Sequence, residues 1–176
     1  MTIAEMIKKY RICLATEGRI GVYNASAAKR DGMVETIMGK KAEIIAYINA
    51  KQEAEAKAKA EREAKIASIE GLAEIKNAIR AEREYHAAFE KMMEDEYNDG
   101  AFAPKTPETD LSALKARYPR AAAYLKAESW THAANYAKVS AGNKAIERII
   151  NGDDYDAAIR DMEKEFGDYC DKHMWD

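Results

Sequence analysis

Apolar residues along this chain follow a helical repeat almost from the first residue. Behind Thr2, a candidate N-cap with Glu5 three positions later, apolar side chains recur every three or four residues at Ile3, Met6, Ile7 and Tyr10. After an expected loop at 24–31, the same spacing returns at Met33, Ile37, Ile44, Ile45 and Ile48. The first fifty residues therefore predict helices on both sides of a segment that has a different pattern.

That segment, KYRICLATEGRIGVYNA (residues 9–25), alternates instead. Apolar and polar residues take turns in RICLA and RIGVY, which predicts two strands with Ile12 and Leu14 facing Ile20 and Val22. Residues 16–18 would form the turn, where Gly18 can adopt the positive φ that such a turn needs. Because a lone hairpin is marginally stable in water, we expect the flanking helices to cover its apolar face.

The first fifty residues therefore predict the order helix, hairpin, helix, helix. The hairpin has the pattern I-x-L-x-x-x-G-x-I-x-V (residues 12–22), and a later helix has the pattern K-x-E-I-I-x-x-I (residues 41–48). This arrangement resembles the small N-terminal docking domains of nonribosomal peptide and polyketide synthetases, which also occur on phage and mobile-element proteins. The resemblance implies an αββαα fold that recognises another polypeptide through the strand edge of its hairpin, although no synthetase domain follows here. We therefore predict an edge for partner binding or self-association at Arg19, Ile20, Gly21, Val22 and Tyr23. The alternative is that the hairpin only completes a small core.

Residues 51–99 predict one long helix whose character changes partway. The stretch KQEAEAKAKAEREAK (residues 51–65) has no large apolar residue, and its Glu and Lys side chains support a solvated, semi-rigid helical spacer. From Ile66 an apolar stripe begins, which predicts packing against another helix or a seam that joins two copies of the chain as a homodimer. His86 is expected at a buried or boundary position of that stripe, whose members are Ile66, Ile69, Leu72 or Ala73, Ile75, Ile79, His86, Phe89 and Met93.

The end of this helix carries an acidic cluster, made of Glu90, Glu94, Asp95, Glu96 and Asp99. Carboxylates at a helix C-terminus oppose the macrodipole and therefore cost stability there. The cluster is either a solvated helix end before a Pro-containing loop or an acidic surface that imitates nucleic-acid phosphate and binds a basic groove. A calcium site is not favoured, because the spacing does not fit a twelve-residue calcium-binding loop.

Residues 104–176 predict a compact helical bundle. Pro119 suits the first turn of a helix, and the small residues between 133 and 145 would let neighbouring helices approach closely. Tyr124, Trp130 and Tyr136 are expected to fill the wider gaps in the core. The predicted fold class is therefore mainly α, with a small N-terminal αββαα module at 1–50, a long connecting helix at 51–99 and a C-terminal helical bundle at 104–176.

Composition and charge narrow the class of protein. The chain has 176 residues and a net charge of −3; residues 1–50 carry eight basic and five acidic side chains, whereas residues 51–176 carry twenty and twenty-six. This distribution does not favour direct nucleic-acid binding. No apolar run approaches the length of a membrane span, and the first residues lack a signal-peptide pattern. We therefore expect a cytoplasmic protein with no membrane contact.

Little in the sequence predicts chemistry. Cys170 and His173 form a C-x-x-H pair that His132 could join, but a structural zinc site needs about four ligands and the second half of the pattern is absent. With only two cysteines, Cys13 and Cys170, near opposite ends of the chain, reduced thiols are expected. No P-loop, dinucleotide-binding fingerprint or H-E-x-x-H motif is present. We predict a non-enzyme that uses no cofactor and no metal.

Two binding functions remain. The blocks at 118–138 and 168–176 resemble accessory proteins of temperate phages, and the whole chain is similar in character to phage-borne anti-CRISPR proteins that inhibit type II RNA-guided nucleases. This resemblance implies a stoichiometric inhibitor that acts in the cytoplasm of the bacterial host and covers the DNA groove of a CRISPR effector ribonucleoprotein or blocks its domain motions. The alternative is a phage or mobile-element adaptor or scaffold that docks a replication or packaging partner through residues 1–50.

Overall fold

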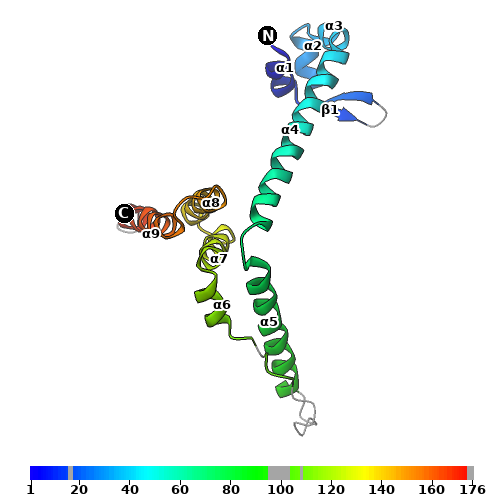
Figure 1. The fold of residues 1–176 in the computed structure, drawn as a ribbon. Helices are drawn as coiled ribbons and strands as arrows, with labels where there is room; N and C mark the ends of the chain where they lie inside the picture. Colours follow the sequence, from blue (N-terminus) through cyan, green and yellow to red (C-terminus); the bar gives the residue numbers. More distant parts are fainter. Residues whose placement is uncertain (16–17, 95–103, 108, 174–176) are drawn as a thin grey trace. The chain divides into compact units, whose positions relative to one another are not determined.

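The computed structural model describes residues 1–15, 18–94, 104–107 and 109–173, and it is mainly α-helical, as predicted (Figure 1). The chain divides into two compact units, Met1–Glu61 (unit 1) and Arg62–Asp176 (unit 2). Unit 1 contains α1 (Ile3–Tyr10), β1 (Ile12–Ala15), β2 (Arg19–Val22), α2 (Ala25–Arg30), α3 (Val34–Gly39) and most of α4 (Lys41–Ala67). Unit 2 contains the end of α4, then α5 (Leu72–Glu94), α6 (Leu111–Arg117), α7 (Pro119–Thr131), α8 (Tyr136–Ile150) and α9 (Tyr155–His173).

The start of unit 1 follows the sequence prediction closely. Thr2 Oγ1 accepts a hydrogen bond from Glu5 N–H at 3.2 Å, and Glu5 Oε2 accepts one from Thr2 N–H at 2.8 Å, so α1 begins with the expected capping box. β1 and β2 pair antiparallel in the predicted register, with Ile12 opposite Val22. Gly18 has the expected positive φ, 69°. Residues 16 and 17 of the predicted turn lie outside the described residues.

The segment 24–31 differs from the prediction, because it contains helix α2 where a loop was expected. Its sequence, NASAAKRD, has no large apolar residue that would mark a helix face. Ala27 and Ala28 are nevertheless buried in the core of unit 1, since small side chains bring the α2 backbone close to its neighbours. The other buried members of this core are Met6, Tyr10, Ile12, Ile37 and Ile44.

The predicted spacer at 51–65 is helical and lies within α4, with every side chain exposed. The helix does not run on to residue 99 as expected, because α4 ends at Ala67 and α5 starts at Leu72. Gly71, in the break, has a φ of +73°, and a Cβ there would lie 2.1 Å from the ring of Tyr118. The left-handed backbone and the close aromatic ring together explain why the chain turns at a glycine.

Unit 2 is built around a core of small and aliphatic side chains. Asp110 caps α6 by accepting hydrogen bonds from the N–H groups of Ser112 and Ala113, and Pro119 is the first residue of α7, as predicted. Helices α7, α8 and α9 pack as the expected bundle. Their buried contacts include Ala121, Tyr124, Ala127, Ala141, Ala145, Ile149 and Met162, and α5 adds Leu72 and Ile75.

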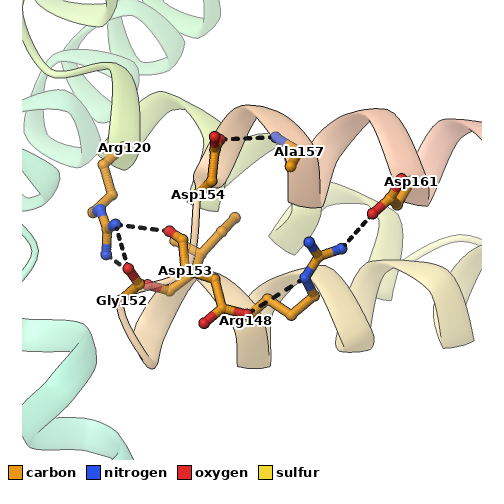
Figure 2. A network of polar contacts seen from close by, with 8 residues as sticks. Arg120, Arg148, Gly152, Asp153, Asp154, Ala157 and Asp161 are labelled. Carbon is orange, nitrogen blue, oxygen red and sulfur yellow. Dashed lines mark hydrogen bonds and ion pairs between the residues drawn. The ribbon is translucent and has the colours of Figure 1, made fainter.

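Two arginines fix the connection between α8 and α9 (Figure 2). Arg120 donates to the carbonyl oxygens of Ile149, Gly152 and Asp153 at 2.9, 3.2 and 2.8 Å, which satisfies backbone acceptors at the end of α8. Arg148 contacts the carboxylate of Asp161 on α9 at 2.7 Å and that of Asp153 at 3.5 Å. The loop is therefore tied to all three helices of the bundle.

Two expected core positions were assigned wrongly. His86 is exposed, because the stripe on α5 packs against other helices only up to Ile79. Tyr136, the first residue of α8, is 85% exposed. Trp130, by contrast, is half-buried against the core and stacks edge-on against Phe166, with ring centroids 5.5 Å apart.

Candidate partner-binding surfaces

The hairpin of unit 1 presents the predicted strand edge. Among the described residues the sheet has only β1 and β2, so the outer edge of β2 has no strand partner there. The side chains of Ile20 and Val22 pack against the core of unit 1, while Arg19 is exposed and Tyr23 is 80% exposed. Gly21 lies close to β1, because a Cβ added to it would be 3.0 Å from Cys13 Sγ. Four of the five residues predicted for partner binding therefore form β2, and Tyr23 follows in the turn after it, with its N–H donating to Arg11 O at 3.3 Å.

A small apolar pocket lies beside this edge. Its volume is about 120 Å³, and its lining is Val22, Ala25, Ala28, Lys29, Val34, Ile37 and Met38. Small-molecule sites typically have about 300–1,000 Å³, so this pocket suits a single apolar side chain better than a ligand. Val34 and Met38 at its rim are 43% and 59% exposed. Sequence analysis missed this pocket, because it depends on α2, the helix that the apolar pattern did not predict.

One polar cluster holds α1 to the end of α2 on the same unit. Tyr10 Oη donates a hydrogen bond to Asp31 Oδ2 at 3.0 Å, and Lys9 Nζ lies 2.8 Å from the same oxygen. The Lys9 ammonium and the Tyr10 hydroxyl hold the pKa of the Asp31 carboxyl below its ordinary value. The carboxylate in turn raises the pKa of Lys9. This cluster positions α2, which forms one wall of the apolar pocket.

Only part of the predicted acidic surface is described. Glu90 is exposed near the end of α5, and Glu94 is the last residue of that helix. Asp95, Glu96 and Asp99 lie outside the described residues. Beside Glu90 the structure has apolar side chains that sequence analysis expected to be packed: Phe89 is 40% and Met93 is 68% exposed.

The candidate metal ligands are not brought together. Cys170 is half-buried, and His132 and His173 are exposed. His173 lies against Tyr169, with ring centroids 4.6 Å apart. The described part of the chain contains no group of three or more Cys, His, Asp or Glu side chains that could hold a metal ion. Nor does any helix in it combine the length and apolar character that crossing a membrane requires.

Comparison with known proteins adds no assignment: no protein-family model matches this chain, and no curated protein or solved structure matches it.

Proposed function

We propose that this chain acts by binding another protein through unit 1, and that its partner is a type II CRISPR effector nuclease, which it inhibits stoichiometrically. The observation that supports protein binding best is the outer edge of β2 next to a pocket with exposed apolar side chains. An incoming strand can pair with the outer edge of a sheet, and a neighbouring pocket can then select one of its side chains. The two features together are more specific than either alone.

The proposed partner rests on the phage-like character of the sequence, not on the geometry of unit 1. An inhibitor of this kind needs no cofactor and no reaction, only a surface that occupies the effector. The acidic cluster at the end of α5 would supply a second contact, because the DNA channel of a nuclease is basic. Exposed Glu90 is available for that role.

Cleavage assays with purified type II effectors test the proposal, with guide RNA loaded before or after the protein is added. We expect the wild-type chain to inhibit at an equimolar ratio. Met38→Lys and Val34→Lys place a charge at the rim of the apolar pocket and should weaken binding about tenfold or more, as losses at an interface centre do. Tyr136→Lys makes the same kind of change at an exposed site of unit 2 and should bind as wild type does.

The outcomes test separately the binding surface on unit 1 and the identity of the partner. Inhibition that survives Met38→Lys would remove the pocket from the mechanism. Absence of inhibition against every effector would remove the nuclease as partner. The adaptor function would then be favoured if unit 1 still captured a phage replication or packaging protein and Met38→Lys abolished that capture.

A further inference from the structure

The second half of α5 carries an apolar face that nothing in the described structure covers. Up to Ile79 this helix packs on α6 and α7, with Leu72 and Ile75 in the core. Beyond Ile79 the same face continues at seven-residue spacing through His86 to Met93, with Phe89 between them. His86 is exposed, and Phe89 and Met93 are 40% and 68% exposed.

Aromatic side chains on and beside this face contact one another along the helix. The rings of Tyr85 and Phe89 stack with centroids 6.1 Å apart, and Tyr85 meets His86 edge-on at 5.5 Å. His86, Phe89 and Met93 follow at three- and four-residue steps over about two turns, the spacing that a second helix packs against.

The charges beside the face identify the occupant. Arg83 and Glu90 are both exposed on the same flank of the stripe, seven residues apart. Neither has an ion-pair partner among the described residues, although Arg83 lines a cavity with Glu128 of α7. A two-fold axis that crosses the helix between His86 and Ala87 places Arg83 of one copy opposite Glu90 of the other, because both lie equally far from that point. The two-fold axis also places Glu90 of the first copy opposite Arg83 of the second. The flank that carries Arg83 and Glu90 is therefore complementary to itself only when the two helices run antiparallel.

A parallel pairing would not use these charges. Each residue then lies level with its own copy, so Arg83 and Glu90 remain about 10 Å apart along the axis, since a helix rises about 1.5 Å per residue. We propose that two copies of this chain associate antiparallel through the face of α5 formed by His86, Phe89 and Met93, with reciprocal Arg83–Glu90 ion pairs. The proposal does not depend on the partner of unit 1, and a dimer of this kind would occupy Glu90 and so compete with the nuclease contact proposed for the acidic cluster.

The seam covers only about two turns, so the dimer is weak and depends on concentration. Sedimentation equilibrium of the full chain from about 5 to about 500 µM covers the range in which such small interfaces dissociate. We expect the wild-type chain to shift from monomer to dimer within it. Phe89→Ala should remove the dimer, whereas Tyr136→Ala, at an exposed aromatic residue of α8, should leave it unchanged.

Charge reversal tests the geometry. Arg83→Glu and Glu90→Arg should each weaken the dimer about fivefold or more, because each homodimer then carries two like-charge contacts in place of two ion pairs. An equimolar mixture of the two variants should dimerise again, since the heterodimer restores an opposite-charge pair at both contacts. Lys57→Glu, an equal change of charge on the exposed part of α4, is the control and should have no effect.

A wild-type chain that stays monomeric throughout the range would overturn the proposal, as would a mixture no more dimeric than each variant alone. All three α5 positions are exposed, so thermal unfolding should show that the variants fold as the wild type does. A dimer that persists in Phe89→Ala would place the interface elsewhere and also overturn it.

Discussion

Tyr10, at the end of α1, reaches Asp31, the C-cap of α2, through a hydrogen bond of 3.0 Å from its hydroxyl to Oδ2. The ring of Tyr10 is fully buried in the core of unit 1, whereas the carboxylate is on the surface. One side chain therefore fills the core and also fixes the position of α2. Because α2 lines the apolar pocket beside β2, this contact connects the stability of unit 1 to its proposed binding surface.

Tyr10→Phe should keep the packing of the ring and lose this hydrogen bond. We expect a loss of about 1 kcal/mol in the free energy of unfolding, the usual contribution of one hydrogen bond. Tyr23→Phe removes a hydroxyl from a side chain that is 80% exposed and should change nothing measurable. Urea denaturation with hydrogen exchange at α2 amides measures both, and equal stability of the two variants would contradict the assignment.

The same carboxylate predicts a dependence on pH. The folded-state pKa of Asp31 is lowered by Lys9 and Tyr10, so its contribution to stability is present above the unfolded value of about 3.9 and is lost as the pH falls through the lowered pKa. Asp31→Asn should therefore reduce the loss of stability of unit 1 on acidification below about pH 4. Wild-type and variant proteins that lose stability in parallel over this window would show that Asp31 contributes nothing to it.

The hairpin shows what the apolar pattern could predict. Strict alternation of Ile12, Leu14, Ile20 and Val22 predicts one face of the hairpin; the observed register agrees with it, and Ile12, Ile20 and Val22 contact the core of unit 1. The helices of the C-terminal bundle were predictable for the same reason, because their stripes are long and their caps, such as Asp110, are common helix-start residues.

What the sequence could not predict depends on tertiary contacts. Helix α2 buries alanines, which carry almost no periodic signal, and the break at Gly71 depends on the ring of Tyr118, which is distant in sequence. The stripe on α5 was predicted correctly, but its spacing could not show that its packing partners extend only as far as Ile79. His86 was therefore placed in a core that does not reach it.

Gly142 of α8 lies close to the backbone and side chains of α7. A Cβ at this position would lie 2.9 Å from the carbonyl oxygen of Ala127 and 2.9 Å from Cβ of Trp130, so the two helices would have to separate. Gly142→Ala should cost about 1–3 kcal/mol of stability through overpacking.

Gly167 on α9 provides a matched control, because nothing lies within 4 Å of a Cβ added there. Gly167→Ala should stabilise the chain by up to about 1 kcal/mol, since alanine favours the helix. Thermal or chemical unfolding of the two variants should therefore move in opposite directions. A shift of the same sign in both would mean that the approach of α7 and α8 does not limit residue 142.

Arg120 ties α7 to the end of α8 and the connection after it, because its guanidinium donates to the carbonyl oxygens of Ile149, Gly152 and Asp153 (Figure 2). A lysine has one ammonium in place of the planar fork and cannot reproduce this set. Arg120→Lys should cost about 1.5–3 kcal/mol, as expected for hydrogen bonds to a charged donor. Amide hydrogen exchange should also become faster at the start of α9, whose first turn is held by the Ala157 N–H bond to Asp154.

Arg160→Lys, at an exposed position on α9, is the control for Arg120→Lys. If Arg120→Lys, like Arg160→Lys, changed neither the free energy of unfolding nor the exchange rates in α9, the hydrogen bonds of Arg120 would not stabilise the α8–α9 connection.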